Sequence, residues 1–467
     1  MTLHDPIALK ETLNRAAKID VDSGAAADFE TAVRRLHGHR VQVRVGREVA
    51  TSAAHQAALL TVVNVARRFA LGGVLVEGPL EGAVITGPVP GIRLGRAVVD
   101  LGGIPGPMSA GIPTIAIGTV EDAAGPGTQV TFEGWRGGVV RLGRPRLAEG
   151  AGAIPAAVLG AALATGEAFA MLRGEIEAGR RSLGLSLWRP DAGSDWRSPA
   201  SDGPDLQFLP DHLWVLGLGH LGQAFLWTLM MCAYPEAGKV RLTLQDMDTV
   251  TGSTDSTSIL TQVDMLGRRK TRAVADVLER RGFATTLIER PFDDRFSQDP
   301  AADPAVLVCG VDNALARARL EEPGFPFVVE AGIGHRSGDY RALRVHTFPS
   351  GGKSARDLWG SRIMQESLNL SRPAYRRLAE AGGNVCGIAQ LAETAVGAPF
   401  VGTVAGVLML AQVMRLIQGD APEALIDLDL RAPGARRALG NTATVTAAPS
   451  YQEALQSALT RAARPLW

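Results

Sequence analysis

The sequence predicts an α/β protein with a doubly wound, mainly parallel sheet, and three observations in its second half lead to this prediction. A hydrophobic strand at Leu213–Leu216 runs into the glycine-spaced turn Gly217-Leu-Gly-His-Leu-Gly222 and then into an apolar helix. A second strand ends at Asp246, and a third, Val306–Val308, ends shortly before Asp312. Strands that alternate with helices over short connections are typical of parallel sheets covered by helices.

The size and charge of the chain limit its organisation and its partners. With 467 residues, the chain exceeds one ordinary core, and roughly 100–200 residues per domain predict two or three domains. The 48 basic and 48 acidic side chains give a formal net charge of zero. No general electrostatic field therefore attracts nucleic acid or an anionic membrane, and we expect neither as a partner.

Cysteine usage and the N-terminus predict a reducing cytoplasm. Cys232, Cys309 and Cys386 form no CxxC pair, which excludes a disulfide framework and argues against a cysteine-rich zinc site. The start of the chain, Met1–Pro6, lacks the basic and apolar regions of a signal peptide. The most apolar segment, Phe400–Ile417, approaches the length of a membrane span. Its many small residues favour a buried core helix instead.

A change in composition divides the chain. Residues 182–211 are rich in Trp, Pro, Gly, Ser and Asp, as surface connectors are. We therefore predict a linker at 186–210 between an N-terminal domain, 1–185, and a C-terminal domain, 211–467. The latter carries a cysteine-bearing crossover segment near 350–395.

The N-terminal half resembles a degenerate copy of the same plan. Its pattern predicts a strand at Val41–Val45, a helix at Ala54–Phe69 and a second strand at Gly73–Val76. The turn after the first strand, Gly46–Thr51, lacks the glycines that let a backbone approach a pyrophosphate.

A second similarity supports an internal duplication. Ile154–Gly160 leads through an apolar helix to Met171–Glu175, much as Ala398–Gly402 leads to Leu416–Asp420. Both segments come last in their halves. The alternative is that helices rich in Ala and Gly resemble each other by chance. Under duplication, we expect an inactive N-terminal half that supports an active C-terminal half.

The glycine-spaced turn has the features of a nucleotide site. Gly217 permits the tight turn, Gly219 lets the backbone approach phosphate, and Gly222 lets the following helix pack on the sheet. Phosphate would lie at the helix N-terminus. Asp246 ends the next strand, where a carboxylate binds ribose hydroxyls. These features fit NAD and ATP equally, and a purely structural turn remains the alternative.

Residues further along favour ATP over NAD. Lys270, which follows Gly267 at an expected helix start, suits a triphosphate. Asp312 lies on the carboxyl edge of the sheet and can hold Mg2+ with help from Asp248. The alternatives are a solvated Lys270 and a helix N-cap formed by Asp312 and Asn313.

Four ordered motifs resemble those of the ThiF-type superfamily, which includes ubiquitin-activating enzymes and the sulfur-carrier adenylyltransferases. The family pattern reads Gly-x-Gly-x-x-Gly, Asp-x-Asp-x-(Val/Ile), Ser-Asn-Leu-Asn-Arg-Gln, Gly-x-x-Lys and Asp-Asn-x-x-x-Arg. All but the third occur here, as Gly217–Gly222, Asp246–Val250, Gly267–Lys270 and Asp312–Arg317. The resemblance covers roughly Leu213–Gly419 and implies a Rossmann-like adenylation fold.

The resemblance also implies residue roles and cofactors. The expected cofactors are ATP and Mg2+: Asp246 binds ribose, Lys270 the phosphates and Asp312 the magnesium. Asp248 and Asn313, with the three glycines, complete the expected nucleotide site.

The third motif departs from the family. An ungapped count places Thr254 and Thr257 where the family has Asn and Arg. The loss of one such charged donor can cost on the order of 100-fold in rate, because hydroxyl groups supply no charge. Four arginines are candidates for its replacement: Arg34, Arg35, Arg268 and Arg269.

The two-half plan looks like that of ubiquitin-activating enzymes, and the activating enzymes of bacterial ubiquitin-like conjugation operons are the nearest resemblance. The composition, rich in Ala, Gly and Arg, agrees with a bacterial source. Sulfur-carrier relatives pair two identical chains, so a homodimer also remains a possible assembly.

Cys386 is the candidate nucleophile among the three cysteines. It follows the glycine-rich Ala381–Asn384 and precedes an expected helix, Gly387–Glu393, whose dipole favours a thiolate. The alternative is a small buried packing residue. Cys232 lies in an apolar helix and Cys309 ends a buried strand, so we expect both to be packing residues.

The predicted function is ATP-dependent activation of the C-terminal carboxylate of a ubiquitin-like protein, with a thioester on Cys386 and transfer to a conjugating enzyme. An NAD-dependent oxidoreductase and a catalytically silent scaffold remain as rivals. His335 and His346 lie in or beside expected strands and receive no role.

Overall fold

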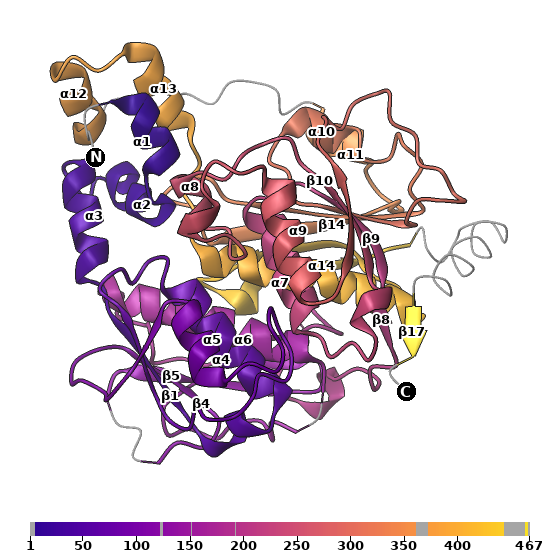
Figure 1. Ribbon diagram of the computed structural model, residues 1–467, viewed down its shortest axis with the longest axis horizontal. Coiled ribbons are helices and arrows are strands. Elements are labelled where there is room, and N and C mark those ends of the chain that lie inside the picture. Colours follow the sequence, from indigo (N-terminus) through magenta and orange to yellow (C-terminus); the bar gives the residue numbers. More distant parts are fainter. Residues whose placement is uncertain are drawn as a thin grey trace.

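The computed structural model describes residues 5–121, 125–150, 152–191, 193–360 and 372–442, and the backbone of 463–465. The N-terminal and C-terminal halves each contain one large sheet, and the apolar helices lie where the halves meet (Figure 1).

The C-terminal half contains an eight-stranded sheet in the order β11-β10-β9-β12-β13-β14-β15-β16. The strands from β11 to β13 pair in parallel, and those from β13 to β16 pair antiparallel. Because β9 lies between β10 and β12, its carboxyl end is a switch point where ligands of such sheets bind. The strands are β9 (His212–Leu216), β10 (Arg241–Gln245), β11 (Ala284–Ile288), β12 (Val306–Cys309), β13 (Phe327–Ile333), β14 (Ala342–Phe348), β15 (Glu423–Asp429) and β16 (Arg437–Gly440).

The N-terminal half repeats this topology. Its sheet has the order β3-β2-β1-β4-β5-β6-β7, parallel from β3 to β5 and antiparallel from β5 to β7. Counted from its first strand, each half has the order 3-2-1-4-5-6-7, and the C-terminal sheet adds an eighth strand at the end. The predicted duplicated, mainly parallel α/β fold is thereby confirmed. The strands are β1 (Val41–Val45), β2 (Val74–Glu77), β3 (Gly103–Pro105), β4 (Thr114–Ile117), β5 (Gly127–Glu133), β6 (Arg136–Arg141) and β7 (Leu183–Ser186).

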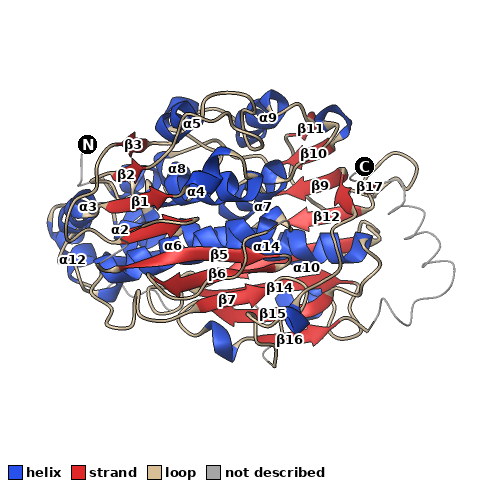
Figure 2. Ribbon diagram, turned by 90° about the horizontal axis from the view of Figure 1, so that it is seen from below, coloured by secondary structure: helices blue, strands red, loops and turns tan. Residues whose placement is uncertain are grey.

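Four apolar helices join the halves (Figure 2): α4 (Ala53–Ala66), α6 (Ile154–Leu172), α7 (His220–Met231) and α14 (Pro399–Ile417). The two segments that suggested duplication form α6 and α14, which have 19 residues each and pack against one another. Both are long and apolar enough to cross a membrane, but 83% and 100% of their apolar windows are buried inside the protein. The prediction that α14 is a core helix is confirmed.

A group of short helices forms a cap at one corner of the molecule (Figure 1). We call α1 (Pro6–Thr12), α2 (Arg15–Ser23), α3 (Phe29–Gly38), α12 (Pro373–Glu380) and α13 (Val385–Glu393) the helical cap. Helix α1 contacts α13 and also α8 (Gly252–Asp255), which lies in the C-terminal half. The N-terminal residues thus touch the segment where the third motif departs from the family.

The remaining described elements lie around the sheets. They are α5 (Leu94–Asp100), α9 (Lys270–Arg280), α10 (Ala314–Ala318), α11 (Ala355–Trp359), the pair β8 (Phe208–Pro210) and β17 (Ala463–Pro465), and the 3-10 turns η1 (Arg47–Ala50), η2 (Pro199–Ser201), η3 (Ala237–Lys239), η4 (Val263–Met265) and η5 (Pro433–Ala435).

Candidate active site

The glycine turn after β9 is built as its spacing predicts. Gly217 has φ +85°, a conformation that side chains disfavour. A Cβ on Gly222 would lie 1.9 Å from the Gly217 carbonyl oxygen, so only glycine allows α7 to pack this closely. A Cβ on Gly219 would meet no atom within 4 Å. The turn is therefore closely packed between Gly217 and Gly222, and there is free space next to Gly219.

Asp246 is held beside this turn. One of its carboxylate oxygens accepts a hydrogen bond from the Leu218 backbone N–H at 2.7 Å, and the other accepts one from the Asp248 N–H at 2.8 Å. Its side chain is only 8% exposed. The carboxylate expected to bind ribose is thus fixed next to the expected phosphate turn.

Lys270 completes this group. It is the first residue of α9, and its Nζ lies 2.8 Å from Asp248 Oδ2 and 3.9 Å from Asp246 Oδ2. The side chain of Asp248 is largely exposed. Because water can solvate the Asp248 carboxylate, the Lys270 ammonium group can leave it and bind a stronger anion such as a phosphate.

Asp312 and Asn313 follow β12, the next strand along the carboxyl edge. Asp312 is exposed, whereas the Asn313 side-chain oxygen accepts hydrogen bonds from the N–H groups of Leu315 and Ala316 at 2.9 and 3.1 Å. The helix-capping alternative therefore holds for Asn313. Its contact with a nucleotide stays a prediction.

The arginine of the last motif, Arg317, has a structural partner. Its Nε lies 2.7 Å from Glu330, a fully buried residue of β13, and its guanidinium stacks 3.5 Å from the centre of the Trp359 ring. The second Glu330 oxygen lies 2.7 Å from His346 Nδ1 and accepts from Trp359 Nε1 at 3.2 Å. His346, which received no role from the sequence, belongs to this buried cluster, which holds α10 against the sheet.

Arg15 is the residue that the sequence analysis missed. Located at the start of α2, it donates from Nε to Ser253 Oγ at 2.5 Å and from its backbone N–H to Ser256 Oγ at 3.0 Å. Burial lowers the pKa of Arg15, and the charge of nearby Asp312 opposes that shift. A Cβ on Gly397 would touch both Arg15 and Thr257. A guanidinium from the N-terminal helices thus lies where the family arginine is replaced by threonine.

The four arginines named from the sequence have other contacts. In the N-terminal half, Arg34 pairs with Glu30 and Arg35 with Asp20. In the C-terminal half, Arg268 pairs with Asp276, and Arg269 donates to the Met247 carbonyl. Arg15 offered only a weak local signal, an arginine after a helix-capping Asn14. Its position beside Ser253 and Ser256 depends on the packing of α2 on the other half of the chain.

Family models match most of the chain. One described as the BilD C-terminal domain matches residues 209–420, and one described as the BilD N-terminal domain matches residues 40–187. The bacterial E1-like protein BilD of Collimonas sp. (strain OK412) is 43% identical over 414 residues, which span 87% of this chain and 89% of that relative. The chain belongs to the BilD family.

Solved structures with some likeness to this BilD-family chain include selenomethionine PaaA and MccB of E. coli. Their sequence identities are 18% and 14% and their TM-scores 0.31 and 0.32. Each match covers 50% of this chain, with 72% of PaaA and 63% of MccB. The fold of the BilD-family chain is established by its two sheets, independently of these distant likenesses.

The three thiols of this BilD-family chain differ in environment. Cys232 and Cys309 are buried, and burial raises the pKa of each to about 12, which confirms the prediction that they are packing residues. Cys386 is exposed in the first turn of α13, where the Asn384 side chain accepts from its N–H at 2.8 Å. The alternative of a buried packing residue is therefore wrong for Cys386, and its role as nucleophile stays a prediction.

The N-terminal half of the BilD-family chain is built differently at the position equivalent to the phosphate turn. After β1 the chain forms η1, and Glu48 accepts a hydrogen bond from the Thr119 N–H at 3.1 Å. The Ser52 side chain caps α4. The Ser52 cap therefore uses an N–H group at the start of α4 that a phosphate would need, and the inactivity of this half stays a prediction.

Proposed function

We propose that this chain is an E1-type enzyme that uses ATP to activate the C-terminal carboxylate of a ubiquitin-like protein and then holds it as a thioester on Cys386. The observation that carries the proposal is the grouping of Asp246, Asp248 and Lys270 beside an open glycine turn. Membership of a family of E1-like proteins supports it.

The residues present suit ATP and magnesium. The triphosphate fits over Gly219 at the N-terminus of α7, with ribose on Asp246 and Lys270 turned towards phosphate. Mg2+ commonly takes one or two protein carboxylates and completes its shell with phosphate oxygens and water, so exposed Asp312 can serve as its protein ligand. When bound, the metal neutralises charge on the phosphates.

In the first step, an oxygen of the carrier's terminal carboxylate attacks the α-phosphorus of ATP, and the bond to pyrophosphate breaks. The protein contributes position and charge: Lys270 and Arg15 offset the negative charge that builds on the phosphates. In the second step, the Cys386 thiolate attacks the acyl carbon and AMP leaves, which yields a thioester. A conjugating enzyme is the proposed acceptor.

The location of Cys386 supports its role. It lies in the helical cap, outside the nucleotide turn, and α1 connects its helix to α8 beside that turn. Part of the predicted crossover segment, residues 361–371, lies outside the described residues.

Two measurements test the proposal with the full chain and a candidate ubiquitin-like carrier protein. Exchange of labelled pyrophosphate into ATP should depend on the carrier, and a thiol-sensitive adduct should appear on the wild type and Cys232→Ala but not on Cys386→Ala. An adduct that persists in Cys386→Ala refutes the nucleophile assignment. Carrier binding without exchange would identify a silent scaffold, and NAD binding without ATP binding an oxidoreductase.

A further inference from the structure

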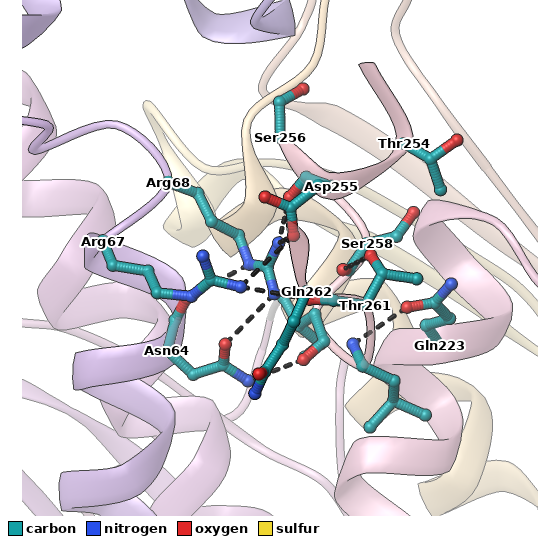
Figure 3. Close-up of polar contacts among 12 residues, drawn as sticks. Asn64, Arg67, Arg68, Gln223, Thr254, Asp255, Ser256, Ser258, Thr261 and Gln262 are labelled. Carbon is teal, nitrogen blue, oxygen red and sulfur yellow. Dashed lines mark hydrogen bonds and ion pairs between the residues drawn. The ribbon is translucent and has the colours of Figure 1, made fainter. Parts of the chain in front are cut away.

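Residues at the end of α4, in the N-terminal half, form hydrogen bonds to the segment 255–261 of the C-terminal half (Figure 3). Arg68 donates from Nη1 to the Asp255 carboxylate and from Nη2 to the Thr261 carbonyl, each at 3.0 Å. Arg67 donates to the same two groups at 3.3 and 3.1 Å. Asn64 donates to the Ile259 carbonyl at 2.7 Å.

Arg68 is an unusual residue at this junction because its side chain is only 1% exposed. Burial and the neighbouring Arg67 lower the pKa of Arg68 to about 9, and Asp255 acts in the opposite direction. A buried cation requires a paired anion and satisfied donors. Asp255 supplies the anion, and the oxygens of Asp255, Thr261 and Asn64 accept from the donors of Arg68. The position of the segment and the charge of Arg68 therefore depend on each other.

The segment 255–261 is connected to the nucleotide turn by hydrogen bonds through Gln223. The Leu260 N–H donates to Gln223 Oε1 at 2.8 Å, and Gln223 Nε2 donates to the Leu218 carbonyl at 2.8 Å. The Leu218 N–H in turn donates to Asp246. Hydrogen bonds, joined by the backbone between Leu260 and Thr261, thus connect Arg68 to the carboxylate proposed to bind ribose.

Arg15 binds at the start of this segment and just before it. Ser253 and Ser256, on either side of Asp255, accept the hydrogen bonds from Arg15. A shift of Asp255 would therefore move Arg15 and the glycine turn together.

We propose that Arg68 and Asp255 form a latch through which the N-terminal half positions the nucleotide site of the C-terminal half. Arg68 is a positioning residue, because it is buried away from the proposed ligand and acts through Asp255 and Gln223. This inference rests on the proposed nucleotide site, but not on the identity of the carrier or on the thioester step.

A second ion pair between the halves provides a matched control. Arg341, on the C-terminal side, donates to Glu175, which follows α6, at 2.8 Å. Neither residue contacts the glycine turn or the segment 255–261 in the described part of the chain. Asp255→Asn and Glu175→Gln each neutralise the acid of one inter-half pair, but only the first touches the proposed latch.

The test is the dissociation constant for Mg-ATP, measured by calorimetry on the full chain well below the unfolding temperature of every variant. We expect Asp255→Asn to weaken binding about tenfold, which falls within the usual range of coupling between sites. Glu175→Gln should remain within about twofold of the wild type. Arg68→Lys should retain more affinity than Arg68→Met, because it keeps the charge.

If Arg68→Met does not fold, Arg67→Gln serves in its place, since Arg67 is partly exposed and shares the Asp255 contact. We expect it to weaken binding about threefold, as part of the same coupling.

Unchanged affinity in Asp255→Asn, or an equal loss in Glu175→Gln, would overturn the latch. A wild type that binds Mg-ATP but adenylates no carrier would overturn the proposed function and leave the latch supported by its own affinity series. A wild type that binds no Mg-ATP would overturn both.

Discussion

The Nε atom of Arg15 lies 2.5 Å from the Ser253 hydroxyl, so a helix at the start of the chain supplies a guanidinium to a segment more than two hundred residues away. The segment has lost the arginine of its motif family, and Thr257 stands in that position next to Arg15. We expect this guanidinium to supply the charge that the sequence motif lacks.

Replacement of Arg15 tests this substitution. We expect Arg15→Ala to lower the rate of carrier-dependent pyrophosphate exchange about 100-fold, because it removes a preorganised positive charge at the phosphates. Arg34→Ala is the control, since Arg34 is exposed and pairs only with Glu30 in the described contacts. Equal rates for Arg15→Ala and the control would show that the charge comes from elsewhere.

Two glycines of one turn should separate stability from binding. Gly222→Ala forces a Cβ to within 1.9 Å of the Gly217 carbonyl oxygen, and we expect it to lower the free energy of unfolding by about 2–3 kcal/mol in urea titrations. Gly219→Ala meets open space and should keep its stability. It should nevertheless lose Mg-ATP affinity, because the methyl group occupies the place of the phosphates. The reverse pattern would contradict the assigned geometry.

The cysteines should differ in reactivity. At pH 8 we expect a thiol-specific reagent to modify one cysteine per native chain and three after unfolding. The reason is that burial raises the pKa of Cys232 and Cys309 to about 12, whereas Cys386 is exposed. Mass spectrometry identifies the labelled residue. Cys386→Ala should leave the native chain unlabelled, and substantial labelling of Cys309 would show that the buried strand opens readily.

The Glu330 cluster should make stability depend on pH. Burial acts to raise the pKa of Glu330, but Arg317 and His346 outweigh it and lower the pKa below its ordinary value. A carboxylate with a lowered folded pKa stabilises the protein at neutral pH, and this contribution is lost as the pH falls below about 4.3 towards the folded pKa. Unfolding measured from pH 7 to pH 3 should show a loss for the wild type that is smaller in Glu330→Gln.

At pH 7, Glu330→Gln should itself lower the free energy of unfolding by about 3–5 kcal/mol, because it leaves the buried Arg317 without its anion. Glu30→Gln breaks an exposed pair and is the control, with little expected change. Similar losses in the two variants would mean that the buried cluster is not a special source of stability.

The sequence by itself determined the fold and half of the site. Strand and helix periodicity and the glycine spacing are local properties, so they predicted β9, α7 and the duplicated plan correctly. Asp246 and Asp312 could also be placed at the same edge in advance, because both follow the carboxyl ends of parallel strands of one sheet.

The tertiary structure alone decided which distant charges meet. Arg15 with Ser253 and Arg68 with Asp255 join elements of the two halves that no local pattern connects. In the sequence, each arginine looks like any other charged residue on a helix. Its partner is fixed only when the two halves pack together and burial leaves a single place where the charge can be satisfied.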